Sequence, residues 1–197
     1  MSLRFIAMIF LVSVSPLVTQ AAGTIYFPKG SEKFYPKYLE AMKEPSIFEQ
    51  STNKAVEQYR FLWLRSFHKP ISIRIWKDES GVAMRVVRLG DDDGDKPGKI
   101  EFDQTLNLTT NQWQEFLALL NQATFWKMPC AEKMDVIGFD GSEWVLEGQT
   151  AGTYHMVDRW SPNYDYDGKD RHLENFVICC RYLLIVSKLE IPYKEDY

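Results

Sequence analysis

The sequence predicts an α+β fold: a curved antiparallel sheet of about five to six strands, two main helices packed on it, and an N-terminal arm. Three observations predict this fold. Apolar residues recur at every second position in the middle of the chain, which is typical of half-buried strands. Two longer segments carry apolar residues at helical spacing. Hydrophobic residues make up 45% of the chain and aromatic residues 14%, which is enough for a packed core.

The residues before the predicted sheet are expected to form an arm laid against the domain. Prolines interrupt residues 26–49, and Pro36 is well placed as the first residue of a short helix over residues 37–43. We therefore divide residues 22–197 into an N-terminal arm with a short helix (residues 22–55) and a single α+β domain (residues 56–197).

Four strands are predicted to follow the arm. Residues 56–67 are rich in aromatic residues and leucine, which favours a strand buried along most of its length. Alternating isoleucines mark a second strand from residue 71, and Asp78 to Gly81 form a tight turn into a third strand over residues 82–89, with Gly81 supplying a positive φ. Residues 99–108 alternate in the same way and form the fourth strand.

The polar face of these strands is expected to carry a ladder of charges. If the second and third strands pair so that their aliphatic residues share one face, Arg74 and Arg85 lie together on the other. Two like charges side by side require acidic neighbours. Glu101 and Asp103 of the fourth strand are predicted to supply them.

A helix, a second hairpin and a final helix complete the predicted order. Thr109 or Thr110 opens the first helix, with Gln112 at capping-box spacing from Thr109. The second hairpin is expected over residues 144–160. The final helix, within residues 171–189, is apolar almost all round, so we expect it to be wedged into the core.

The start of the chain predicts export. Arg4 precedes a short apolar run over residues 5–12, and small residues, among them Thr19 and Ala21, follow it. This order is typical of a signal peptide, here residues 1–21, and the run is too short to span a bilayer. We expect a periplasmic or secreted protein with no membrane insertion after cleavage.

The charge of the chain limits its partners. The formal net charge is −4, and the charges are spread along the sequence instead of gathered in blocks. A weakly acidic, mixed surface argues against nucleic acid and against anionic lipid as ligands.

Three cysteines permit at most one intramolecular disulfide. In an oxidising compartment we expect Cys130 to pair with Cys179 or Cys180. The alternative is that Cys180 is a small apolar core residue.

Several sequence blocks resemble a group of exported bacterial proteins that carry no assigned function. The blocks are residues 59–70 (YRFLWLRSFHKP), Phe125-Trp126, residues 140–148 (DGSEWVLEG) and residues 154–162 (YHMVDRWSP). The resemblance implies a bacterial exported protein, and it implies no activity and no catalytic residue.

The second hairpin holds the main candidate for acid–base chemistry. If its aromatic and aliphatic residues point to the core, strand alternation places a polar set on the opposite face: Glu143, Glu147, His155 and Arg159. A histidine with carboxylates and an arginine can catalyse a hydrolase-type reaction, chiefly through Glu147, His155 and Arg159. The same residues can form a surface ladder of salt bridges, which we favour because the sequence marks neither a nucleophile nor a metal beside them.

A second candidate is a calcium loop. Asn163, Asp165, Asp167 and Glu174 stand at the first, third, fifth and twelfth positions of an oxygen-rich loop, with Gly168 at its sharp bend. Calcium is the only cofactor that the sequence suggests. The alternative is a solvated acidic turn that caps the final helix.

These observations give one leading hypothesis on function and two alternatives. The leading hypothesis is an exported non-enzymatic domain that binds an envelope or secreted protein, as an inhibitor or immunity protein does. The alternatives are a calcium-binding module through residues 163–174 and a hydrolase-type enzyme. The oligomeric state is left open.

Overall fold

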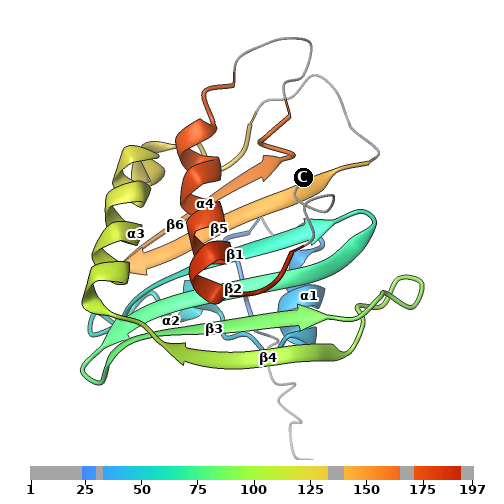
Figure 1. Cartoon of the computed structure of the whole chain (residues 1–197), viewed down its shortest axis with the longest axis horizontal. Coiled ribbons are helices and arrows are strands. Elements are labelled where there is room, and N and C mark those ends of the chain that lie inside the picture. The colour runs from blue at the N-terminus through green and yellow to red at the C-terminus, as the bar shows by residue number, and fades with distance from the viewer. Residues whose placement is uncertain (1–23, 30–32, 133–139, 165–170, 192–197) are drawn as a thin grey trace, which may run out of the picture.

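One six-stranded antiparallel sheet organises the protein (Figure 1). The computed structural model describes residues 24–29, 33–132, 140–164 and 171–191. The strand order across the sheet is β4-β3-β2-β1-β5-β6. The strands are β1 (Glu57–Arg65), β2 (His68–Asp78), β3 (Gly81–Leu89), β4 (Ile100–Asn107), β5 (Ser142–Thr150) and β6 (Thr153–Trp160).

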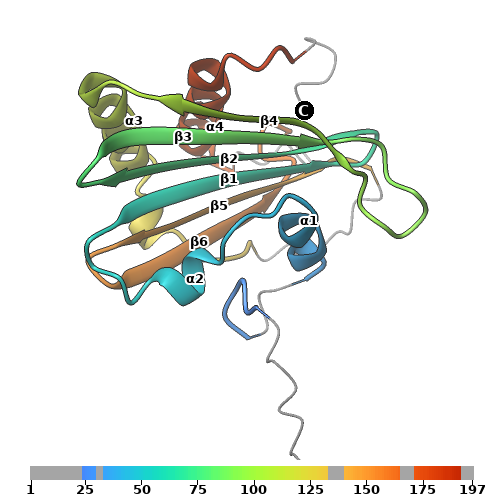
Figure 2. The same ribbon diagram turned by 90° about the horizontal axis from the view of Figure 1, so that it is seen from below.

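Helices cover both faces of the sheet (Figure 2). The two long helices, α3 (Thr110–Gln122) and α4 (Glu174–Ser187), lie on what we call the helix face, and a short 3-10 helix, η1 (Phe125–Lys127), follows α3. The opposite face, which we call the arm face, is covered by α1 (Tyr35–Ala41) and α2 (Ile47–Gln50). The predicted α+β class, the two main helices and the N-terminal arm are confirmed.

Alternation along the strands builds the core of the helix face. Tyr59, Phe61 and Trp63 of β1 are almost fully buried there, and Trp113 and Phe116 of α3 pack in the same cluster. Burying such side chains stabilises each by about 1.5–3 kcal/mol relative to exposure. The predicted capping box is present at the start of α3: the Thr109 side chain accepts from the Gln112 amide, and the Gln112 side chain accepts from the Thr109 amide.

The arm builds a second core on the other face. Phe27, Tyr35 and Leu39 are buried against Leu62 and Val145 of the sheet. Pro36 lies in the first turn of α1, as the sequence predicts, and Ser46 caps α2 by accepting a hydrogen bond from the Glu49 amide at 2.9 Å. The arm therefore completes the fold, because it shields the buried apolar side chains of this face from water.

The prediction that the last helix is wedged into the core is wrong for part of its surface. Cys179, Cys180 and Leu183 are fully buried, but Ile178 and Ile185 are 50% and 74% exposed. The helix packs on the sheet on one side and along α3 on another (Figure 1). The two exposed isoleucines, seven residues apart, lie on a side of the helix that meets neither.

The expected disulfide is also absent, since all three cysteines are free. Cys130 is exposed, whereas Cys179 and Cys180 belong to α4 and are buried in the core of the helix face. Burial raises the pKa of the Cys179 thiol to about 12. The adjacent pair therefore serves as small core side chains, the alternative that the sequence left open.

Within the described ranges, no helix combines the length and the apolar content needed to cross a bilayer.

A glycine in the centre of the sheet makes room for an aromatic ring. Gly148 of β5 pairs with Tyr59 of β1, and a methyl group at Gly148 would lie 2.6 Å from Cε1 of the ring and closer still to Cδ1. We expect Gly148→Ala to lower the free energy of unfolding by about 1–3 kcal/mol, because the ring must move within a packed core. Chemical denaturation measures the change.

A double-mutant cycle tests the cause of that loss. In a Tyr59→Leu background, Gly148→Ala should cost clearly less than in the wild type, because the obstructing ring is gone. Equal costs in the two backgrounds would show that ring contact is not the reason.

Candidate functional site

The register of the second hairpin separates the residues that were predicted to share a polar face. Ala151 and Gly152 form a two-residue turn in which both φ angles are positive, at 50° and 88°. This turn pairs Thr150 with Thr153, so even-numbered residues of β5 share a face with odd-numbered residues of β6. The prediction of one constellation is wrong: Glu143 and Glu147 lie on the arm face, and His155 and Arg159 lie on the helix face.

Each of these residues has partners that explain its place without catalysis. The Glu147 carboxylate is fully buried, accepts from Arg60 Nε at 2.8 Å and accepts from the Tyr154 hydroxyl at 3.0 Å. The His155 ring packs against Phe125, and its Nε2 lies 3.0 Å from the Met128 carbonyl oxygen. Burial lowers the pKa of His155, although that carbonyl acts in the opposite direction.

The Arg159 guanidinium binds backbone carbonyl groups. Its guanidinium donates to the carbonyl oxygens of Pro129 at 2.8 Å and of Asp158 at 2.7 Å. These bonds hold the segment after η1 along the edge of β6. No hydrolase-type site is assembled from Glu147, His155 and Arg159.

The arm face instead carries three arginines in a row. Arg60 of β1 pairs with Arg74 of β2, and Arg74 pairs with Arg85 of β3, so their side chains lie side by side across the middle of the sheet. Like charges directly opposite one another are destabilising in a sheet, and their partial burial makes the repulsion stronger. Carboxylates must therefore be present on the same face.

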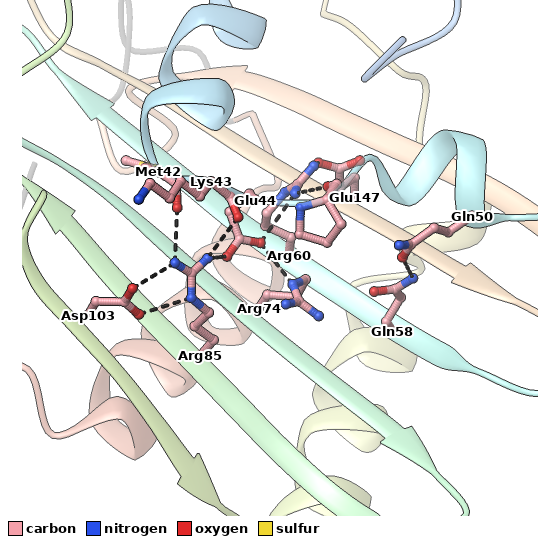
Figure 3. A network of polar contacts seen from close by, with 11 residues as sticks. Met42, Lys43, Glu44, Gln50, Gln58, Arg60, Arg74, Arg85, Asp103 and Glu147 are labelled. Atoms are coloured by element: carbon pink, nitrogen blue, oxygen red, sulfur yellow. Dashed lines mark hydrogen bonds and ion pairs between the residues drawn. The ribbon is translucent and has the colours of Figure 1, made fainter. Parts of the chain in front are cut away.

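Glu44, from the arm between α1 and α2, forms ion pairs with all three arginines (Figure 3). Its fully buried carboxylate accepts from Arg74 Nε at 2.8 Å, from Arg60 at 3.3 Å and from Arg85 at 2.5 Å. Glu147 neutralises Arg60 from one side, and Asp103 receives two hydrogen bonds from Arg85 on the other. Three arginines thus meet three carboxylates.

The predicted charge ladder is confirmed for Arg85 and Asp103 and wrong for the other pair. Arg74 binds Glu44, and Glu101 pairs with Lys69 at 2.7 Å. Glu44 was not predicted, because its partners lie on strands far along the chain. One signal in the sequence pointed to such a residue. Arg60, Arg74 and Arg85 share a face on which the strands supply fewer carboxylates than these arginines require.

A second acidic cluster binds the start of α1 to the end of the β5–β6 hairpin. Asp158 accepts from the Tyr35 hydroxyl at 2.8 Å and pairs with the Lys33 ammonium at 2.6 Å, and Glu143 lies 3.6 Å from the same ammonium. Burial and the neighbouring Asp158 raise the pKa of Glu143 to about 7, against the opposing effects of Lys33 and Tyr35.

The calcium loop stays a prediction. Asp165 and Asp167 lie outside the described residues, while Asn163 lines a surface hollow and Glu174 stands in the first turn of α4. An acidic residue in a first turn is stabilised by the helix dipole without a metal. Among the described residues, no group of three or more metal-ligating side chains is gathered.

The most exposed aromatic side chains among the described residues lie near the turn between β1 and β2. Phe67 in that turn is 70% exposed and Tyr164 is 59% exposed. Both line a hollow of about 700 Å³ whose other walls include Trp160 and Gly141. We call this the aromatic hollow. Phe34 of the arm, 46% exposed, lines an adjoining hollow that also reaches Gly141 and Trp160.

The backbone holds this surface in place. The Ser66 amide donates to the Gly141 carbonyl oxygen at 2.9 Å, and the Gly141 amide donates to the Ser66 hydroxyl at 3.1 Å. Gly141 has a φ of 148°, and a Cβ there would lie 2.8 Å from the Trp160 ring. Only glycine lets this ring pack so closely on the backbone at that point.

Arg171 fixes the turn that carries Tyr164. Its guanidinium donates to the carbonyl oxygens of Trp160 at 2.9 Å, Ser161 at 2.8 Å and Tyr164 at 3.2 Å, and it forms an ion pair with Glu132. The apolar run over residues 56–67 predicts a buried strand that includes Phe67, so this surface was not predicted. Phe67 lies two positions beyond the last strand residue, where burial no longer constrains it.

Comparison of the chain with protein-family models and with curated proteins finds no match.

The Glu44 contacts generate a stability prediction. We expect Glu44→Gln to lower the free energy of unfolding by about 3–5 kcal/mol, because it leaves three half- to fully buried arginines with one carboxylate too few. Glu40→Gln is the matched control, since Glu40 lies on the exposed side of α1, and it should change stability by less than about 0.5 kcal/mol. Similar losses in both variants, measured by urea denaturation, would contradict the assignment.

The raised pKa of Glu143 predicts a pH dependence. Between about pH 5 and pH 7 the folded protein binds a proton at Glu143 that the unfolded chain has released, so this residue's stabilising contribution is lost as the pH rises through the folded pKa. His155, whose pKa is lowered, acts in the opposite direction. Comparing the wild type with Glu143→Gln at each pH cancels the histidine contribution.

We expect the glutamine variant to gain stability relative to the wild type as the pH rises from about 5 to about 8, by on the order of 1–3 kcal/mol. A difference between the two proteins that stays constant over this range would mean that Glu143 ionises near its ordinary pKa.

Proposed function

We propose that this protein is an exported, non-catalytic domain that binds a partner protein through the surface around Phe67. The observation that carries the proposal is the aromatic hollow, where exposed aromatic side chains stand on a backbone that is tied in place. Aromatic residues are enriched at the centres of protein interfaces, where they supply much of the binding energy. Exposed apolar surface of this kind marks interaction sites on otherwise polar domains.

The geometry favours a partner that presents an apolar side chain. Phe67 and Tyr164 line the aromatic hollow together with Trp160, which is half-buried and packs against Gly141. A hollow whose backbone is already ordered binds an apolar side chain at a smaller entropic cost than a mobile loop does. The ties from Ser66 and Arg171 provide that order.

The dispersal of the acid–base candidates also favours binding over hydrolysis. The Glu147 carboxylate binds Arg60, and the Arg159 guanidinium binds the Pro129 carbonyl group, so neither side chain is available to a substrate. The predicted signal peptide, residues 1–21, lies outside the described residues, and the envelope or secreted location of the partner follows from that prediction.

Site-specific photocrosslinking in the producing cell tests this function. A photoreactive phenylalanine analogue in place of Phe67 should give one discrete adduct, which Tyr164→Ser and Trp160→Ala each reduce by about tenfold. The same analogue at Ile185 is the control, because Ile185 is 74% exposed on α4 away from the hollow. Equal adducts at both positions, or an adduct at Phe67 that ignores both substitutions, would contradict the proposal.

A further inference from the structure

A second hollow lies on the other side of Phe67 and gathers cations. Its volume is about 600 Å³, and it shares Phe67 and His68 with the aromatic hollow. Arg65, Lys69 and Arg88 line it, and we call it the basic hollow. The hollow therefore continues the proposed binding surface onto the helix face.

Strand register brings these cations together. Arg65 ends β1 opposite His68, which begins β2, and Arg88 stands near the end of β3 opposite Ile71. The strands β1, β2 and β3 are neighbours in the sheet (Figure 1). Their ends thus supply the charges. In a chain of net charge −4, this is a local departure from the overall balance.

The cations lie deeper than the acids around them. Arg65 is buried and Arg88 is half-buried, whereas Asp91 and Glu190, which also line the hollow, are exposed at its rim. Lys69 is engaged by Glu101 at 2.7 Å. The interior of the basic hollow is therefore positive.

Arg65 and Arg88 supply the two guanidinium groups of the basic hollow. Arg65 is oriented by stacking over the Trp63 ring, 4.3 Å from its centre, and by donating to the Lys69 carbonyl oxygen at 2.8 Å. Arg88 Nε is buried, and no hydrogen-bond acceptor is found for it among the described residues. A buried donor without an acceptor costs about 1–3 kcal/mol, so an acceptor that enters from outside recovers that free energy.

We propose that the basic hollow binds carboxylate side chains of an acidic segment of the partner protein. This proposal rests on the proposed function, since it names the chemistry of the same partner. A carboxylate offers two oxygens in a plane, which matches the donor pair of a guanidinium better than any neutral acceptor does. Because the two hollows meet at Phe67 and His68, the partner segment carries an apolar residue beside its acidic ones.

Fluorescence anisotropy with a synthetic peptide of alternating glutamate and leucine tests this directly. The full-length mature protein should bind the peptide, bind its glutamine analogue at least about tenfold more weakly, and lose affinity as salt is added. Arg88→Gln should weaken binding of the acidic peptide by about tenfold. Lys77→Gln, which removes an exposed charge elsewhere on β2, should leave it unchanged.

A second readout separates binding from folding. Addition of the acidic peptide should shift the NMR resonance of Arg88 Nε–H. The melting temperatures of the Arg88→Gln and wild-type proteins should agree closely, which excludes unfolding as the cause of any loss of affinity. Equal affinity for the two peptides, or an unchanged Arg88 resonance, would overturn the proposal.

Two further arms identify the source of the carboxylate. If inorganic phosphate displaces the peptide and shifts the Arg88 resonance more strongly than the peptide does, the hollow is a phosphate site and the proposal is wrong. If the peptide binds only after Glu195→Gln and Asp196→Asn, the chain's own acidic residues are the ligand, and the proposal is again wrong. Crosslinking at Phe67 that persists while the acidic peptide fails to bind would overturn this inference alone and leave the proposed function standing.

Discussion

The structure depends on one electrostatic constraint: three arginines stand in register across the central strands of the arm face, and they cannot be buried there without carboxylates. Strand pairing places Arg60, Arg74 and Arg85 side by side. The sheet itself provides Glu147 and Asp103 at the two sides of this row, and the arm reaches its middle through Glu44. Docking of the arm is therefore part of folding, because it closes the apolar core of that face and neutralises its charges in the same step.

The same docking prepares the proposed binding surface. Lys33 and Tyr35, at the start of α1, hold Asp158 of β6, two residues before Trp160 at the end of that strand. Phe34 between them adds its ring to the surface. Ser66 and Gly141 fasten the β1–β2 turn to the start of β5. A surface that is ordered before binding loses little entropy when a partner arrives, which favours recognition over chemistry.

The sequence predicted what depends on local patterns. Strand alternation identified the strands of the sheet, and the spacing of Thr109 and Gln112 identified the start of α3. It failed where one residue of register or a distant partner decides the outcome. The two-residue turn at Ala151 and Gly152 moved His155 and Arg159 to the opposite face from Glu147, and that reversal removed the main catalytic candidate.

Local sequence patterns could not predict contacts between residues that are far apart in the chain, for a physical reason. Glu44 meets arginines from three strands only after the sheet has formed, and the burial of Cys179 and Cys180 depends on which side of α4 meets the strands. The aromatic hollow was hidden in the same way, because a strand-like run of apolar residues does not show where the strand ends. Phe67 belongs to the run but lies in the turn.

Native-state hydrogen exchange tests the central claim most directly. The amides of Met42 and Glu44 donate within the arm at 2.9 Å to Tyr38 and Leu39, so their exchange reports the opening of the arm at the carboxylate that binds the arginines. If the arm is held by the arginine row, these amides exchange with nearly the same opening free energy as the amides of β1 and β2, to within about 1 kcal/mol. Rapid exchange in the arm while the central strands stay protected would contradict the claim.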